Sequence, residues 1–326
     1  MESMAVCTLF ERDYHFGVAA LVNSLHRNGF KGNIYAGYRG QLPDWCNSAS
    51  EGQTELGQEL KIMAVSGDIQ LYLIKLDTDY HLTNYKPDFM ISLLEGLCRD
   101  VDSLFYLDPD IILTAPSYFL REWAEAGVAV CEDVNSPVQE YNPKRIAWRE
   151  IYKKYDISLK FKNAIYANGG CLGVSKKNFD FVYLWRKVQD CMGMEIGGLN
   201  RSSFAISDQL SERDAGDFAP FGKTDQDALN VALEAYNGPI SYMTKEAMGL
   251  APGMCILPHA LGHSKPWKNQ LFRDWLRHGF KPRRIDVEFW NNAGAPIRVF
   301  GEKRINIVKK EIKLLAFLSR FYSIKI

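Results

Sequence analysis

The sequence predicts an α/β fold in which a mostly parallel central sheet is covered by helices on both faces, followed by a basic helical C-terminal tail. Short apolar runs rich in β-branched and aromatic residues alternate with segments whose apolar residues recur at helical spacing. This alternation favours strand–helix–strand units. From Lys265 onward an excess of Lys and Arg sets the tail apart from the rest of the chain.

The elements follow in order from the N-terminus. Residues 4–10 are apolar and β-prone, residues 14–29 have a helical pattern that closes on Gly29 as a C-terminal cap, and residues 33–38 predict the next strand. The same alternation then predicts two helices, at 88–101 and 143–155, and further strands at 61–66, 71–77, 103–107 and 127–133.

Length and composition exclude several classes of protein. The 326 residues are 47% hydrophobic and 24% charged, an ordinary globular composition that excludes disorder as the main state. We find no secretory signal and no run of the roughly 18 apolar residues that a membrane span needs. The seven cysteines form no C-x-x-C pair and mostly lie in apolar runs, which predicts a reducing, cytoplasmic compartment: Cys7, Cys46, Cys98, Cys131, Cys171, Cys191 and Cys255.

The zero net charge hides an asymmetry along the chain. From Lys265 to Ile326 there are fifteen Lys and Arg against five acids, and the remainder carries the opposite excess. Residues 302–326 predict a helix with a basic face of Lys309, Lys313 and Arg320 and an apolar face of Ile305, Val308, Ile312, Leu315 and Tyr322, which Ile307, Leu314 and Leu318 widen. We expect this helix to dock on an anionic membrane surface. The alternative is a helix packed on the domain core. No recognition motif for nucleic acid accompanies the charge, so nucleic acid is not expected as a partner.

Two acids follow the strand at 103–107. Asp108 and Asp110 stand at its carboxyl end, and in parallel sheets ligands bind in the crevice beyond that end. An unpaired charge inside the strand would be expensive, so we place both acids in the crevice. The alternative is that they cap a turn.

Three further stretches carry chemistry. Asn168 and two glycines precede an apolar strand, where the backbone can approach a ligand or form a hairpin turn. Residues 223–236 predict a helix that Thr224 or Asp225 could simply cap. Residues 257–267 bring together, after an expected strand, an imidazole suited to metal, a glycine, and a lysine suited to phosphate: His259, Gly262 and Lys265. Two carboxylates and one imidazole suit Mn²⁺, with Mg²⁺ possible, and leave positions for diphosphate oxygens.

Taken together, "FYLDPD", "NGG", "TDQDALN" and "HALGHSKPW" resemble the family 8 retaining glycosyltransferases of GT-A fold. This family includes glycogenin and bacterial lipopolysaccharide α-galactosyl- and α-glucosyltransferases. The resemblance covers roughly residues 4 to 270. It implies a GT-A catalytic domain at 1–270 and a basic helical extension at 271–326.

The resemblance also implies roles for individual residues. Metal ligation would fall to Asp108, Asp110 and His259, and donor diphosphate binding to Gly262 and Lys265. Uridine would be surrounded by Thr8, Leu9 and Tyr14. The donor sugar or acceptor would be contacted by Asn168, Asp225, Gln226 and Asp133. Two features depart from the family: Ala260 replaces an aromatic residue, and a basic residue on the helix before the acid pair is missing from 88–97, with Lys86 the nearest cation.

The resemblance implies a retaining, metal-dependent enzyme that moves galactose or glucose from a UDP-sugar to a hydroxyl of a glycan or lipid-linked saccharide, at the cytoplasmic face of a membrane. Gln226 is an amide and a poor nucleophile, which favours same-face attack over a covalent intermediate. A sugar-nucleotide nucleotidyltransferase would need a Gly-rich basic loop that "TLFERDYHFG" lacks. A non-catalytic sugar-nucleotide scaffold is disfavoured because the three metal ligands and Lys265 are all present.

Overall fold

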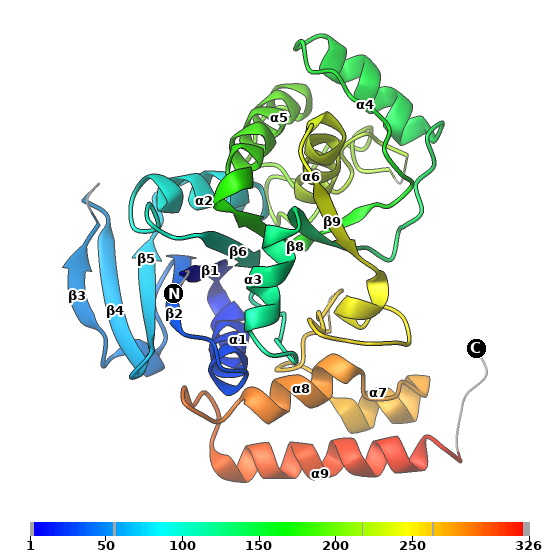
Figure 1. Cartoon of the computed structure of the whole chain (residues 1–326). Coiled ribbons are helices and arrows are strands. Elements are labelled where there is room, and N and C mark those ends of the chain that lie inside the picture. Colours follow the sequence, from blue (N-terminus) through cyan, green and yellow to red (C-terminus); the bar gives the residue numbers. More distant parts are fainter. Residues whose placement is uncertain (1–2, 55–56, 217, 263, 322–326) are drawn as a thin grey trace.

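The computed structural model describes residues 3–54, 57–216, 218–262 and 264–321, which form one nine-stranded sheet with helices around it (Figure 1). The strand order is β3-β4-β5-β2-β1-β6-β8-β7-β9. The strands are β1 Met4–Glu11, β2 Gly32–Arg39, β3 Ser50–Gln53, β4 Glu59–Ser66, β5 Ile69–Lys75, β6 Ser103–Leu107, β7 Val128–Glu132, β8 Ala167–Ser175 and β9 Ile240–Met243.

The predicted fold class is confirmed, with parallel pairing concentrated in the core of the sheet. Strands β5, β2, β1 and β6 are parallel, as is the pair β7–β9. Strands β4 and β5 are antiparallel because a tight turn, Gly67–Asp68, joins them. Strand β8 inserts antiparallel between β6 and β7 and so interrupts the parallel pairing on that side of the sheet.

Alternate residues of β1 enter two different cores. Ala5, Cys7 and Leu9 pack in the cluster that contains residues of α2, α5 and α6, whereas Val6 and Phe10 pack in the cluster of α1 and α3. The sheet is therefore covered on both sides. The helices are α1 His15–Arg27, α2 Lys86–Glu95, α3 Tyr118–Glu125, α4 Pro143–Lys153, α5 Asp180–Ile196, α6 Thr224–Ala235, α7 Leu271–His278, α8 Arg284–Asn292 and α9 Glu302–Leu318.

The C-terminal helices form a third cluster beside α1 (Figure 1). Asn23 of α1 joins them to the rest of the fold, because its Nδ2 atom donates to the carbonyls of Asn292 and Ile297, each at 2.7 Å. No described helix is long and apolar enough to cross a membrane.

The membrane face predicted for α9 is wrong for its main apolar residues, whereas Ile307 and Leu314 at its edge are exposed. Ile305, Ile312 and Leu315 are buried in the third cluster, and Val308 packs against it. The apolar stripe serves packing on the domain, which was the alternative interpretation. Tyr322 lies outside the described residues.

One half-buried acid, Asp88, gives a pH-dependent prediction for stability. Burial in the first turn of α2, together with nearby Asp190, raises the pKa of Asp88 from 3.8 to about 6. Its Oδ2 atom has no hydrogen-bond partner among the described residues. The folded protein therefore binds this proton more tightly than the unfolded chain, and the stability associated with it is lost as the pH rises from about 4 to about 6.

We expect Asp88→Asn to raise the free energy of unfolding at pH 7.5 by about 1 kcal/mol, a value reduced for the partial exposure of this carboxyl. At pH 4 the same substitution should change little. Urea denaturation at both pH values measures the difference, and equal shifts at the two values would contradict the assigned pKa.

Candidate active site

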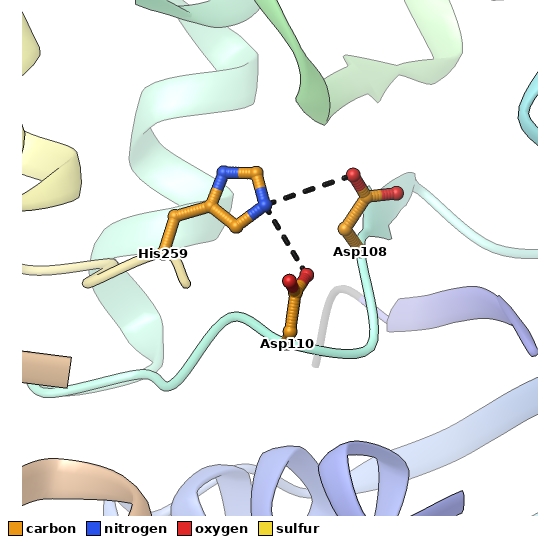
Figure 2. A group of neighbouring side chains, drawn as sticks. All are labelled: Asp108, Asp110 and His259. Atoms are coloured by element: carbon orange, nitrogen blue, oxygen red, sulfur yellow. Dashed lines mark ion pairs between the residues drawn. The ribbon is translucent and has the colours of Figure 1, made fainter. Parts of the chain in front are cut away.

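Asp108, Asp110 and His259 converge beyond the carboxyl end of β6 (Figure 2). Asp108 directly follows β6, and Asp110 lies in the loop that leaves the sheet. The Nε2 atom of His259 lies 3.2 Å from Asp110 Oδ1 and 3.8 Å from Asp108 Oδ2. One ligand atom from each side chain lies within 4.8 Å of the others. The predicted convergence is confirmed, and the donor set suits a hard or borderline divalent cation.

A short backbone pairing, and not a regular strand, delivers His259. Ile111 and His259 form an isolated antiparallel bridge. The N–H of Ala260 donates to the carbonyl of Asp110 at 3.1 Å, which fixes the histidine beside the acids. The expectation that a regular strand carries His259 is therefore wrong, because the pairing amounts to this bridge and a few flanking backbone hydrogen bonds, such as Ile112 N–H to the Pro258 carbonyl at 3.1 Å.

Two lysines bind the same carboxylates. Lys265 Nζ lies 2.5 Å from Asp110 Oδ2, and Lys86 Nζ lies 3.1 Å from Asp108 Oδ1 and 2.8 Å from Asp225 Oδ2. Burial opposes ionisation of Asp110, yet His259 and Lys265 hold its pKa well below the usual range. Burial likewise opposes ionisation of both lysines, and their carboxylate partners nevertheless raise the two pKa values. Asp110 and the two lysines are therefore ionised at neutral pH.

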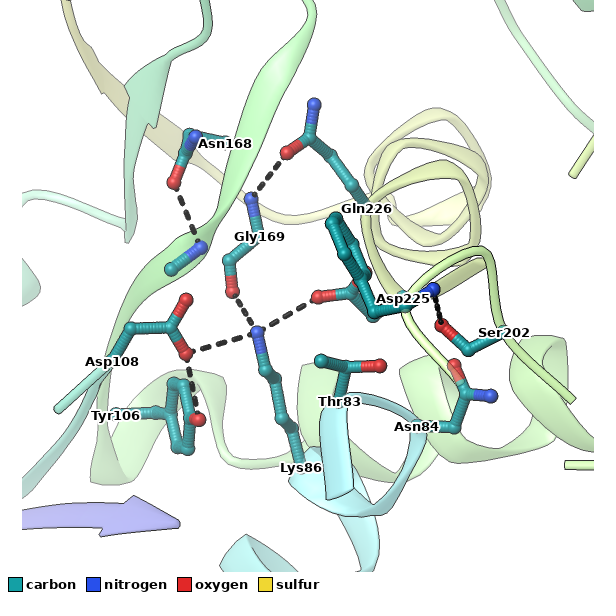
Figure 3. A network of polar contacts seen from close by, with 12 residues as sticks. Thr83, Asn84, Lys86, Tyr106, Asp108, Asn168, Gly169, Ser202, Asp225 and Gln226 are labelled. Carbon is teal, nitrogen blue, oxygen red and sulfur yellow. Dashed lines mark hydrogen bonds and ion pairs between the residues drawn. The ribbon is translucent and has the colours of Figure 1, made fainter. Parts of the chain in front are cut away.

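Lys86 is the basic residue beside the acid pair that the sequence pattern did not reveal. It is the first residue of α2, is 1% exposed, and also donates to the Gly169 carbonyl at 2.8 Å (Figure 3). The inference that no basic residue stands before the acid pair is wrong. A cation in the first turn of a helix is disfavoured by the positive end of the helix dipole. The unfavourable position of Lys86 was therefore the signal in the sequence that its charge has a partner outside the helix.

Strand β8 passes directly beside this cluster because two of its residues have no side chain. Asn168, Gly169 and Gly170 lie within β8 and not before it, and they form no hairpin turn. A Cβ on Gly170 would lie 2.7 Å from His259 Cε1 and 2.8 Å from Asp108 Oδ2. One on Gly169 would lie 2.8 Å from Asp225 Oδ2. Any larger residue would displace the charged groups.

The start of α6 directs two polar side chains to β8 (Figure 3). Asp225 binds Lys86, as described above, and Gln226 Oε1 accepts from Gly169 N–H at 3.1 Å. The Nε2 atom of Gln226 is buried without a hydrogen-bond partner among the described residues. Neither Thr224 nor Asp225 caps the helix with its side chain, so the capping interpretation is wrong for both.

Asp227 stabilises this first turn instead. Its carboxylate accepts from the backbone N–H of Lys223 at 2.8 Å, from Lys144 Nζ at 2.9 and 3.0 Å, and from the Tyr166 hydroxyl at 2.6 Å. Burial raises its pKa, and Lys144 opposes that shift. Both carboxylate oxygens are occupied, so Asp227 anchors α6 to α4 and to the start of β8.

Asp133 lies immediately after β7 and pairs with Asn168. The Nδ2 atom of Asn168 donates to Asp133 Oδ2 at 2.6 Å, and its Oδ1 atom accepts from Gly170 N–H at 2.9 Å. Both side chains are buried. The structure thus joins the two predicted sugar-contacting residues to the β8 segment that borders the metal ligands.

The predicted nucleotide-contacting residues are distributed around the N-terminal strand. Thr8 and Leu9 are buried in β1, and Thr8 Oγ1 has no partner among the described residues. Lys265 Nζ lies 5.5 Å from the centroid of the half-buried Tyr14 ring. Gly262 is exposed and has φ +81°, a left-handed conformation that favours glycine. Contact of these four residues with a nucleotide stays a prediction.

Comparison with known proteins identifies the fold. No family model matches the sequence, and no curated protein matches it. The bifunctional glycosyltransferase WbbM has a TM-score of 0.50 and 13% identity over 97% of this chain and 52% of its own. The apo glycosyltransferase GlyE of Streptococcus pneumoniae TIGR4 has a TM-score of 0.51 and 15% identity over 95% of this chain and 64% of its own.

The galactosyltransferase LgtC, solved with donor and acceptor sugar analogues, has a TM-score of 0.50 and 13% identity. The match covers 92% of this chain and 98% of LgtC. This chain has the GT-A fold of these glycosyltransferases. It spans about half of WbbM and somewhat under two thirds of GlyE, so the full activities of those longer proteins do not transfer with the fold.

Proposed function

We propose that this protein is a retaining, metal-dependent glycosyltransferase that transfers a hexose, galactose or glucose, from a UDP-sugar to a hydroxyl of a glycan or lipid-linked saccharide. The observation that carries the proposal is the convergence of Asp108, Asp110 and His259 beside Lys265, on a fold that solved glycosyltransferases share. The alternative to this proposal is a non-catalytic scaffold that binds a sugar nucleotide without turning it over.

The charges around the site suit a diphosphate once a cation is bound. Asp108, Asp110 and Asp225 carry three negative charges and the two lysines carry two positive ones, so the cluster retains one negative charge. A divalent cation, Mn²⁺ or Mg²⁺, would reverse that sign and stabilise negative charge on the departing diphosphate. Lys265 then has the reach and charge to bind a phosphate oxygen directly.

At the sugar end, Asn168, Asp225 and Gln226 would hold hydroxyl groups, and Asp133 orients Asn168 through a hydrogen bond. The unpaired Nε2 of Gln226 is a free donor for a sugar oxygen. An active-site glutamine has been substituted by glutamate in a solved form of LgtC. Here the glutamine is uncharged, which supports same-face attack by the acceptor, with the departing phosphate oxygen accepting the acceptor's proton.

A panel of UDP-hexoses with and without Mn²⁺ tests the proposal. We expect metal-dependent release of UDP from UDP-galactose or UDP-glucose, and an α-linked product by NMR when a saccharide acceptor is added. UDP binding without turnover of any donor would favour the scaffold. A covalent sugar trapped on Gln226, Asp225 or Asp227 would overturn same-face attack.

We also propose that the 271–326 extension docks the protein on an anionic membrane surface through the exposed edge of the predicted face, extended by Phe317 and Phe321. Ile307, Leu314, Phe317 and Phe321 of the α9 segment are each more than half exposed and recur at helical spacing. Leu314→Ser with Phe317→Ser should weaken co-sedimentation with phosphatidylglycerol vesicles, and the same substitutions at Ile312 and Leu315 should instead lower the melting temperature. Equal sedimentation of wild type with phosphatidylcholine vesicles would contradict a charge-dependent surface.

A further inference from the structure

A polar cavity lies beside the chain segment that follows Lys265, the lysine of the candidate metal site. Its volume is about 330 Å³, within the range of small-ligand sites. Lys265 faces Asp110, whereas its neighbour Ser264 lines this cavity, so the loop between His259 and α7 contributes to both places. The other lining residues come from the loop end and from α7: Lys268, Asn269, Gln270, Arg273, Asp274, Arg277 and His278.

The lining is basic, and the charges of its two arginines are poorly compensated. It contains Lys268, Arg273, Arg277 and His278 against the single acid Asp274, but Lys268 Nζ forms an ion pair with Asp13 Oδ2 at 2.7 Å. Within the described residues, the Arg277 guanidinium has no hydrogen bond or ion pair, and Arg273 donates only to Gln270 Oε1, at 3.0 Å. Such a cavity is suited to a ligand that brings negative charge.

The spacing of the two arginines strengthens this argument. Arg273 and Arg277 are four residues apart on α7, so they are neighbours on one face of the helix. Like charges at this spacing repel each other and destabilise a helix. An anion bound between the two guanidinium groups would remove that repulsion, and its oxygens could accept two hydrogen bonds from each planar guanidinium.

The wall opposite α7 is held in place by a buried acid. Asp286 of α8 is 2% exposed, accepts from Asn269 Nδ2 at 2.6 Å, and caps its own helix through the backbone N–H of Arg283 at 2.8 Å. Arg283 in turn donates to the Ser264 carbonyl at 2.6 Å. The loop that lines the cavity is therefore shaped by α8 without any ligand.

We propose that this cavity binds a phosphate group, and that Arg273 and Arg277 are its principal ligands. The exposed side chains of Phe272, Leu276 and Phe280 lie on and directly after the same helix, which places apolar surface beside the basic cavity. A phosphate ester of the acceptor, free or attached to a lipid, fits both features. Only the naming of the acceptor as the carrier of the phosphate rests on the proposed function.

The first test asks whether inorganic phosphate stabilises the full chain against thermal unfolding, in metal-free buffer at constant ionic strength. We expect a saturable rise in melting temperature for the wild type, and an apparent Kd at least tenfold higher for Arg273→Gln with Arg277→Gln. The matched control, Lys303→Gln with Lys310→Gln, removes equal charge from exposed positions of α9 and should bind phosphate as the wild type does. Without phosphate the arginine variant should melt no lower than the wild type.

Vesicles identify the source of the phosphate. Binding to phosphatidylcholine vesicles that contain phosphatidic acid, lost in the arginine variant and retained in the lysine control, assigns a lipid phosphate. Binding of inorganic phosphate alone assigns a soluble phosphorylated acceptor, and both results support the cavity. Equal binding by the two variants, or no saturable binding of either probe, overturns it. UDP binding with Mg²⁺ should be unchanged in both variants, which separates this outcome from failure at the donor site.

Discussion

Asp110→Asn should lower the turnover of the UDP-sugar donor by roughly 10² to 10³-fold, the range found when one electrostatic contact to a transition state is removed. The amide preserves the shape of the 5%-exposed side chain but removes its charge. His259 and Lys265 then lose the carboxylate that lies 3.2 and 2.5 Å from them. The remaining Asp108 and His259 hold a divalent cation weakly.

The measurement is initial rate against Mn²⁺ concentration, with Mn²⁺ binding followed separately by electron paramagnetic resonance. Asp100→Asn, an exposed acid near the end of α2, is the matched control and should leave both quantities unchanged. If Asp110→Asn turned over donor at the wild-type rate and the wild-type Mn²⁺ requirement, the three side chains would not form the metal site.

Lys86→Met should be the most destabilising single substitution in the site, with a loss of about 3 to 5 kcal/mol in the free energy of unfolding. The side chain is 1% exposed and its ammonium group lies between Asp108 and Asp225. Methionine fills a similar volume, but it leaves two carboxylates and the Gly169 carbonyl without their shared donor. Donor turnover should fall as well, because Asp225 is no longer held toward β8.

Urea denaturation measures this effect, and a second substitution tests its cause. Lys86→Met with Asp225→Asn should be more stable than Lys86→Met alone, since one uncompensated charge is removed. Lys86→Arg retains the charge and provides a folded variant if the methionine variant does not fold. Lys31→Met breaks an exposed ion pair with Asp68 and should leave the unfolding midpoint unchanged. A lower stability for the double variant would show that size, not charge, governs this position.

The period of apolar residues predicted most strands and helices, because the side chains of a strand alternate and those of a helix repeat every 3.6 residues whatever lies beyond them. The acid pair after residues 103–107 and the histidine of the 257–267 motif were recognisable for a similar reason, since a charge at the end of an apolar run needs a local explanation. Antiparallel insertion of β8 has no such local signal.

What the sequence by itself determined is therefore the α/β alternation, the acid pair at a strand end and the chemistry of the histidine loop. Only the tertiary structure decided that Lys86 completes the charged cluster and that Ile305, Ile312 and Leu315 pack on the domain. Lys86 meets Asp225 across 139 positions of the chain. A local pattern states which groups need a partner, and packing of distant segments decides which partner they find.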